Sequence, residues 1–380
     1  MTKPQPVRGY IEGYYGRLLS WPERHDLLGT MHNLGMNAYL YAPKEDACHR
    51  IRWRQDWDQQ WWQGFTAFTA AAREQGITVM AGIAPGIDLD FASLDASGGD
   101  HDTAILRDKA KRLITAGADQ ICLLLDDIDP LFTRRQGRFS HEGEAHAALT
   151  NAMAGHLDCP VSVVPRIYAD EITEGAEGYL TAFAQTLMAG VTVFTCGSHI
   201  VAPVIDPESM GITAAGISPG QLIIWDNLYA NDYCPRRMFL GRYRGRDAAD
   251  AVMLNPAGML HTDAMLLALM QAGDDTGAWR QVVLDHGVPE EFFTIAGFFD
   301  LPPDPRTDPA PMMPDPAMAD EWLTALETLL WRWKAPLQRE WYPFLMGLRG
   351  DILYQAGQMD DLRKAKVLPP LLNIAHRNRD

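Results

Sequence analysis

The feature that most constrains the fold is a regular alternation of short apolar segments with stretches of helical periodicity. The apolar segments recur roughly every 30–40 residues, the spacing of repeated strand–helix units. Eight of them are expected as strands, near Arg8–Glu12, Met36–Tyr41, Ile77–Ala84, Gln120–Leu125, Val161–Val164, Val191–Thr195, Leu222–Trp225 and Ala251–Leu254.

Amphipathic stretches separate these segments and are expected as helices. They are Pro22–Leu34, Trp61–Gln75, Ala104–Ala116, Glu142–His156, Gly178–Ala189 and Pro207–Ile212. Eight strand–helix alternations favour an α/β fold of the (β/α)8 TIM-barrel type. The alternative is a doubly wound parallel sheet, which normally has about five or six strands.

The pattern changes after about residue 272, so we expect a catalytic barrel over residues 1–272 and a smaller helical domain over 273–380. Residues 301–318, rich in Pro, Asp and Met, are typical of a linker or loop. Helices are expected at Trp279–His286, Pro289–Phe298, Ala319–Trp333 and Gln338–Gln358. The last two carry Trp322, Trp331, Trp333 and Trp341, which suit core packing or, alternatively, a homodimer surface.

Composition excludes several classes of protein. The net charge of −16 argues against nucleic-acid binding, which needs a basic face. No apolar stretch approaches the ~20 residues of a membrane span, and the first residues lack the apolar core of a secretory signal. The five cysteines are scattered and odd in number, as in proteins of a reducing compartment. We therefore expect a cytoplasmic enzyme.

The fourth apolar segment leads directly into carboxylates, in the sequence Ile121–Asp129. A continuous apolar run is typical of a parallel strand buried on both faces. Asp126 and Asp127 then lie at the carboxyl end of that strand, where barrels place their chemistry. Because two adjacent like charges repel, we expect one of the pair to hold a proton near neutral pH.

Other strands also end in hydrogen-bonding or aromatic residues, notably Lys44, Tyr168 and Asn255. Strand seven contributes Trp225, Asn227 and, further on, Asp232. Carboxylates and amides bind sugar hydroxyls, and aromatic rings stack on the apolar faces of sugars. The combined set therefore indicates a carbohydrate site.

Competing sites have weaker support. The chain has no Gly-Lys pair for a phosphate-binding loop, and no GxGxxG fingerprint follows a strand. His49, His199 and His261 are isolated from one another, which does not favour a metal centre. An acidic cluster of Asp126, Asp127 and Asp129 holding Mg²⁺ or Mn²⁺ remains the main structural alternative.

Several long motifs resemble glycoside hydrolase family 84, the O-GlcNAcase family of β-N-acetylglucosaminidases. They are Gly9–Arg17, Met36–Lys44, Leu124–Asp129, Ile224–Asn227 with Ala230–Tyr233, and Leu254–Pro256, in the order found in that family. The resemblance covers about residues 7–270.

The resemblance implies a retaining exo-β-N-acetylglucosaminidase that needs no metal or other cofactor. In that family the substrate's own 2-acetamido group attacks the anomeric carbon and forms an oxazoline intermediate. By matching position, Asp126 orients and polarises the acetamido N–H. Asp127 is the general acid that protonates the leaving oxygen, and then the base that activates water.

The same resemblance implies the sugar-binding residues. Gly13 leaves room for the sugar, Lys44 donates to a hydroxyl, and Asp232 accepts from the 4- and 6-hydroxyls. Trp225 walls the acetamido pocket and Tyr168 bonds to the reacting centre. Asn227 and Asn255 supply amide contacts.

Some residues depart from the family pattern. Val164 replaces a frequent Cys, Arg166-Ile167 are unusual and are expected to reshape the acetamido pocket or its rim, and Glu45 replaces an Asp. The expected partner is a GlcNAc-bearing glycoside or glycoprotein. Hyaluronidase-like or bacterial-glycan hydrolysis on the same site, and a non-catalytic GlcNAc-binding protein, remain alternatives.

Overall fold

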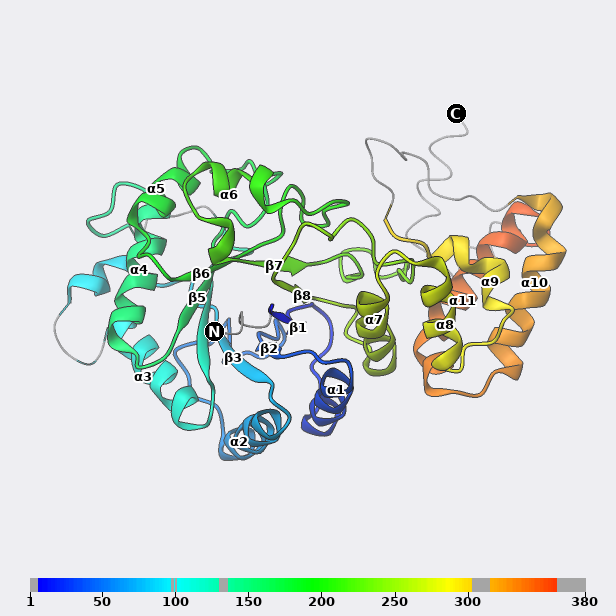
Figure 1. Ribbon diagram of the computed structural model, residues 1–380, viewed down its shortest axis with the longest axis horizontal. Helices are drawn as coiled ribbons and strands as arrows, with labels where there is room; N and C mark the ends of the chain where they lie inside the picture. The colour runs from blue at the N-terminus through cyan, green and yellow to red at the C-terminus, as the bar shows by residue number, and fades with distance from the viewer. Residues whose placement is uncertain (1–5, 97–98, 100, 130–135, 303–314, 361–380) are drawn as a thin grey trace. The chain divides into compact units, whose positions relative to one another are not determined.

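The protein is represented by a computed structural model that describes residues 6–96, 99, 101–129, 136–302 and 315–360. The chain forms two compact units (Figure 1). The first contains the residues up to Leu228 together with Arg244–Leu260, and the second contains Tyr229–Tyr243 and the residues from His261 onward. Each unit is described separately below.

The first unit is a closed barrel of eight parallel strands in sequential order, which confirms the (β/α)8 prediction. The strands are β1 (Arg8–Glu12), β2 (Ala38–Tyr41), β3 (Thr78–Ile83), β4 (Gln120–Leu124), β5 (Val161–Val164), β6 (Thr192–Thr195), β7 (Leu222–Asp226) and β8 (Val252–Leu254). The barrel closes where Gly9 of β1 pairs with Met253 of β8. Closure leaves no unpaired sheet edge.

Helices surround these strands (Figure 1). They are α1 (Trp21–Asn33), α2 (Gln59–Glu74), α3 (Asp102–Thr115), α4 (Glu142–His156), α5 (Tyr179–Thr186) and α6 (Gly211–Ala214). Ser20 and Glu23 form a capping box at the start of α1, and Asp58 caps α2. The helix expected at Pro207–Ile212 is wrong in detail, because a 3₁₀ turn at Pro207–Ser209 precedes the four-residue α6.

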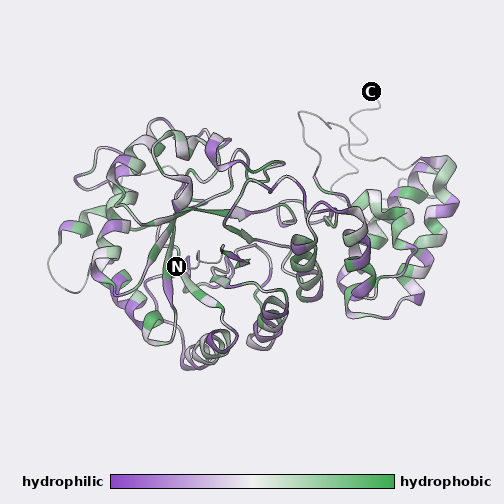
Figure 2. Cartoon of the chain, in the orientation of Figure 1, coloured by the Kyte–Doolittle hydropathy of each residue, from purple (hydrophilic) through white to green (hydrophobic). Residues whose placement is uncertain are grey.

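The barrel interior is filled by alternate residues of each strand, because successive side chains of a strand point to opposite faces. Cys122 and Leu124 of β4 and Ile223 and Trp225 of β7 belong to this buried cluster. In Figure 2 the strands are largely green, whereas the helices mix green and purple residues. The alternation fixes which side chains beyond each strand end face the barrel axis.

The second unit is helical. Its helices are α7 (Leu260–Ala272, whose first residue lies in the barrel unit), α8 (Thr276–Asp285), α9 (Phe292–Ile295), α10 (Ala319–Glu327) and α11 (Pro336–Gln355), with a π-helical turn at Thr328–Arg332. Trp322, Trp333 and Trp341 are buried, which supports core packing, whereas Trp331 is exposed. Residues 303–314, most of the predicted Pro-rich loop, lie outside the described residues.

Within the described residues, no helix is both long and apolar enough to span a membrane.

Candidate active site

Asp126 and Asp127 follow β4 at its carboxyl end, as the sequence predicts. Since Cys122 and Leu124 face the barrel axis, alternation directs Asp126 to the same side and would direct Asp127 outward to the helices. The backbone of Asp127 is instead left-handed, with φ of 52°. This conformation ends the strand geometry and lets both carboxylates serve one site.

Lys44 lies between the two carboxylates. Its Nζ forms an ion pair with Asp126 Oδ2 and lies 3.8 Å from Asp127 Oδ2. The Lys44 and Asp126 side chains are only 2% and 7% exposed, so the ion pair is buried. The other oxygen of Asp126, Oδ1, is buried and has no hydrogen-bond partner among the described residues.

Asp127 is held by two phenols. The Tyr15 hydroxyl donates to Oδ2 at 2.8 Å, and the Tyr168 hydroxyl donates to Oδ1 at 2.8 Å. The Asp127 side chain is 32% exposed, which leaves it accessible from outside the barrel. Both carboxylate oxygens therefore accept hydrogen bonds before any substrate arrives.

We expected one of the two carboxyls to hold a proton, and the surroundings of Asp127 do not favour Asp127 as that one. Burial by itself raises the pKa of Asp127, but the Lys44 charge, the two phenol hydrogen bonds and the Arg50 charge lower it. The net pKa lies below the usual carboxylate value. Together, the Lys44 charge, the two phenol hydrogen bonds and the Arg50 charge outweigh the effect of burial, which favours the ionised form of Asp127 in the free protein.

An amide network forms another wall of the site. Asn255 Oδ1 accepts from the Gly13 N–H at 3.2 Å, and Asn255 Nδ2 donates to Asn227 Oδ1 at 2.9 Å. Trp225 Nε1 also donates to Asn227 Oδ1, at 3.0 Å. These contacts connect the ends of β1, β7 and β8 and fix the orientation of both amides.

Gly13 is required by packing. A Cβ atom at this position would lie 2.2 Å from Trp225 Cζ2 and 2.9 Å from Ile11 Cγ2. The Trp225 indole therefore rests against the backbone of Gly13, just beyond β1, and it is only 6% exposed.

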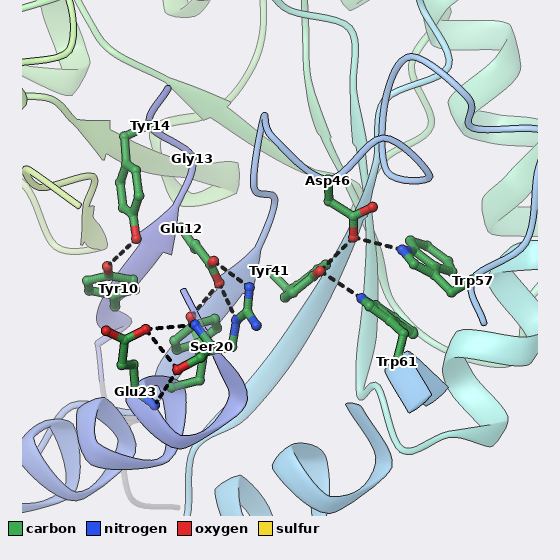
Figure 3. Close-up of polar contacts among 12 residues, drawn as sticks. Tyr10, Glu12, Gly13, Tyr14, Ser20, Glu23, Tyr41, Asp46, Trp57 and Trp61 are labelled. Carbon is green, nitrogen blue, oxygen red and sulfur yellow. Dashed lines mark hydrogen bonds and ion pairs between the residues drawn. The ribbon is translucent and has the colours of Figure 1, made fainter. Parts of the chain in front are cut away.

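The loop that carries Lys44 is fixed from behind by Asp46 (Figure 3). Asp46 Oδ2 accepts from the Tyr41 hydroxyl at 2.6 Å and from Trp57 Nε1 at 2.7 Å. Trp61 Nε1 in turn donates to the Tyr41 hydroxyl at 3.0 Å. Glu45 Oε1 accepts from the Gly16 N–H at 3.1 Å, which ties this loop to the one after β1.

Three other polar residues near strand ends form buried ion pairs instead. Glu12 pairs with Arg24 of α1, Asp226 pairs with Arg246, and Arg166 pairs with Glu142 of α4. Arg166 also donates to the carbonyl oxygens of Glu174 and Gly175. The side chain of Arg166 is thus occupied by these partners, and Val164 belongs to the cluster that fills the barrel interior. The effect of Val164 and Arg166-Ile167 on the acetamido pocket or its rim stays a prediction.

Asp232 belongs to the second unit, in the segment Tyr229–Tyr243, and its Oδ1 accepts from the Tyr233 N–H at 3.0 Å. Its assignment to the sugar hydroxyls stays a prediction. The other eight predicted site residues all lie in the barrel unit: Gly13, Lys44, Asp126, Asp127, Tyr168, Trp225, Asn227 and Asn255.

Sequence reasoning assigned no role to Tyr15 and did not single out Arg50. Arg50 donates to the Tyr15 hydroxyl at 2.6 Å and to the Asp127 carbonyl oxygen at 2.7 Å. Tyr15 lay within a recognised motif, but no pattern marked Arg50, which lies in a turn. The metal alternative finds no support in the described part of the chain, where no three His, Cys, Asp or Glu residues are grouped to hold an ion.

A closed parallel barrel with paired carboxylates, a buried lysine and an amide wall at the carboxyl ends of its strands is typical of barrel glycoside hydrolases. Comparison with known proteins defines the group further. The family model described as beta-N-acetylglucosaminidase matches residues 8–276. The chain belongs to this β-N-acetylglucosaminidase family.

Related proteins agree with this assignment. Over 246 residues the chain is 30% identical to protein O-GlcNAcase of Rattus norvegicus and of Mus musculus. That alignment covers 63% of this chain but only 26% of each relative, so the chain spans about a quarter of their length.

Solved structures show the same fold. An O-GlcNAc hydrolase mutant from Thermobaculum terrenum superposes with a TM-score of 0.74 at 19% identity, covering 98% of this chain and 90% of the other. The protein CpGH84B gives a TM-score of 0.70 at 20% identity, with 97% and 74% coverage.

Proposed function

We propose that this chain is a retaining exo-β-N-acetylglucosaminidase of the O-GlcNAcase type, which removes terminal β-linked GlcNAc by substrate-assisted catalysis. The observation that carries the proposal is the free oxygen of Asp126. Its Oδ2 is committed to Lys44, whereas its buried Oδ1 has no partner among the described residues. A buried carboxylate oxygen without a donor is a strong acceptor for an amide N–H, because leaving it unpaired is costly.

In the first step, Asp126 Oδ1 accepts the hydrogen bond of the substrate's acetamido N–H. This contact increases electron density on the amide oxygen and aims that oxygen at the anomeric carbon. The oxygen forms a bond to the carbon as the glycosidic C–O bond breaks, and protonated Asp127 transfers its proton to the leaving oxygen. In the second step, Asp127 removes a proton from water, water attacks the anomeric carbon, and the oxazoline ring reopens.

The acid role requires a change at Asp127 when substrate binds. Both of its oxygens accept phenol hydrogen bonds in the free protein, which favours the ionised form. For proton donation, the glycosidic oxygen must replace one phenol, and the site must exclude water so that the neutral carboxyl is favoured. Tyr15 and Tyr168 can each reorient a hydroxyl, so either one can release its oxygen.

The remaining assignments follow from the resemblance of the sequence to the family and from the sequence pattern. We assign Gly13, Lys44, Tyr168, Trp225, Asn227, Asp232 and Asn255 to the sugar, with Trp225 as the wall of the acetamido pocket. We also retain the division into a catalytic barrel of residues 1–272 and a helical domain of residues 273–380. A cytoplasmic location, a glycoprotein substrate and a homodimer through the C-terminal helices are parts of the proposal that rest on the sequence.

Hydrolysis of a fluorogenic β-GlcNAc glycoside tests the proposal. We expect activity that withstands EDTA, is abolished in Asp126→Asn, and falls by about 10²–10⁴-fold in Asp127→Ala on substrates with poor leaving groups. On substrates with good leaving groups the Asp127→Ala variant should lose less activity, because such leaving groups depart with little protonation by an acid.

Asp129→Ala is the matched control, because Asp129 is exposed and lies two residues further along the chain. It should retain wild-type rates. Loss of activity in EDTA together with an inactive Asp129→Ala would instead support the acidic metal cluster. Tight GlcNAc binding without turnover would establish the binding-protein alternative.

Hyaluronan and bacterial glycans remain a second candidate for the substrate. The net charge of −16 disfavours a polyanion such as hyaluronan. Release of GlcNAc from a neutral glycoside but not from hyaluronan fragments would separate these substrates.

A further inference from the structure

Arg50 lies beside the proposed acid and contacts both its backbone and its Tyr15 partner. It lies in the turns that follow β2, six residues after Lys44, and is 9% exposed. Its Nη1 donates to the Tyr15 hydroxyl at 2.6 Å and its Nη2 to the Asp127 carbonyl oxygen at 2.7 Å. In the described part of the chain, none of its nitrogens lies within ion-pair distance of a carboxylate. The guanidinium therefore donates hydrogen bonds to two uncharged oxygens.

One of these oxygens, the carbonyl oxygen of Asp127, belongs to a residue with a strained backbone. Asp127 is the one non-glycine residue with positive φ in the described ranges, and L-residues rarely adopt that conformation because Cβ then lies too close to the backbone. The β4 ladder ends at Leu124, so the Asp127 carbonyl oxygen is not paired by the sheet. A charge-assisted hydrogen bond from Arg50 gives this oxygen a strong partner and stabilises the left-handed conformation.

The other oxygen, the Tyr15 hydroxyl, connects Arg50 to the Asp127 side chain. Arg50 donates to the Tyr15 hydroxyl, which donates onward to Asp127 Oδ2 at 2.8 Å. Hydrogen bonds in series polarise one another, so the Arg50 charge strengthens the Tyr15 donor. One guanidinium thus fixes both the backbone and the carboxylate of the same residue.

We propose that Arg50 is a positioning residue that holds Asp127 in its left-handed conformation, so that its carboxyl faces the leaving oxygen beside Asp126. This inference rests on the proposed function. Without the Arg50 hydrogen bonds, Asp127 relaxes toward ordinary strand geometry, and alternation then directs its side chain away from the barrel axis. The loss is specific to proton transfer, because Asp126, Lys44 and the amide wall keep their own contacts.

Leaving-group dependence tests this role. Arg50→Gln is compared with wild type on aryl β-GlcNAc substrates from phenyl, a poor leaving group, to 2,4-dinitrophenyl, a good one. We expect kcat/KM to fall about 10- to 100-fold for the phenyl glycoside and less than about threefold for the dinitrophenyl glycoside. An equal loss on all substrates would indicate general damage to the fold and overturn the proposal.

Two further variants sharpen the test. Arg52→Gln removes the same charge from an exposed position two residues away. It should keep the wild-type dependence of kcat/KM on the leaving group. Arg50→Lys keeps the charge but lacks the fork that reaches two oxygens at once, so it should show the same selective loss as Arg50→Gln. Full activity in Arg50→Lys would show that charge alone matters and would contradict the positioning role.

A structural measurement separates this inference from the proposed function. If wild type fails to hydrolyse every aryl β-GlcNAc substrate, the proposed function fails. The crystal structure of Arg50→Gln then tests Arg50 by itself. We expect Asp127 to leave the positive-φ region in that variant, and an unchanged φ would overturn the proposal.

Discussion

Replacing Lys44 with Met should destabilise the barrel far more than the loss of one surface lysine would. Lys44 and Asp126 form an ion pair whose side chains are 2% and 7% exposed. Removing one partner of a buried pair leaves an uncompensated charge, at a cost of about 3–5 kcal/mol. We expect Lys44→Met to lower the free energy of unfolding by about 3 kcal/mol, the lower end of that range.

Asp127 contributes less to this cost. Its Oδ2 lies 3.8 Å from Lys44 Nζ, but its side chain is 32% exposed. Solvent screening reduces an attraction of this kind to about 1 kcal/mol or less. The buried Asp126 carboxylate therefore accounts for most of the expected destabilisation.

A double-mutant cycle measures this directly by urea denaturation of wild type, Lys44→Met, Asp126→Asn and the double variant. Because the double variant leaves no buried charge unpaired, we expect a coupling free energy of about 2 kcal/mol or more between the two sites. Lys111→Met, at an exposed position on α3, should change stability by less than about 0.5 kcal/mol. Additive single effects, or a Lys44→Met protein as stable as wild type, would refute the buried-pair reasoning.

Two other predictions concern His49 and Gly13. Burial lowers the pKa of His49 to about 4, so between pH 6.5 and 4 the unfolded chain binds a proton that the folded chain does not. His49 should therefore lower the free energy of unfolding by about 3 kcal/mol as pH falls through that window. The His49→Asn variant should lack this pH dependence. If the free energy of unfolding falls equally with pH in both proteins, the reasoning is contradicted. Gly13→Ala should destabilise the barrel by about 1–3 kcal/mol and lower kcat/KM, because the added methyl would lie 2.2 Å from Trp225 Cζ2. Gly29→Ala, whose added methyl meets nothing within 4 Å, is the control, and equal behaviour of the two variants in denaturation and kinetics would contradict the packing argument.

The barrel was predictable because most of its strands are short apolar runs that parallel packing buries on both faces. The predicted Arg8–Glu12 and Val161–Val164 agree with β1 and β5 at both ends. Helix α7 was not predicted, because all but one of the nine residues Thr262–Met270 are buried and no polar face produces a helical period. The inclusion of Tyr229–Tyr243 in the second unit depends on long-range contacts, such as Leu240 N–H to the Phe299 carbonyl oxygen, that no local pattern encodes.

The site residues were predictable where the alternation of inward- and outward-pointing side chains continues beyond the end of a strand. Gly13, Asn227 and Asn255 each lie two residues beyond an interior side chain, and the structure joins them in one network. Glu12, Asp226 and Arg166 were equally polar, but each found a buried ionic partner that the sequence does not reveal. The left-handed backbone of Asp127 was also hidden, because Asp is not a residue that requires positive φ.

The central claim is that the substrate's own amide, oriented by Asp126, is the nucleophile. Its most direct test is kcat/KM for aryl glycosides whose N-acetyl group carries zero, one, two or three fluorines. Fluorine withdraws electron density from the amide oxygen, so the account predicts a steep fall in kcat/KM with each substitution. A rate that is independent of fluorination would contradict it.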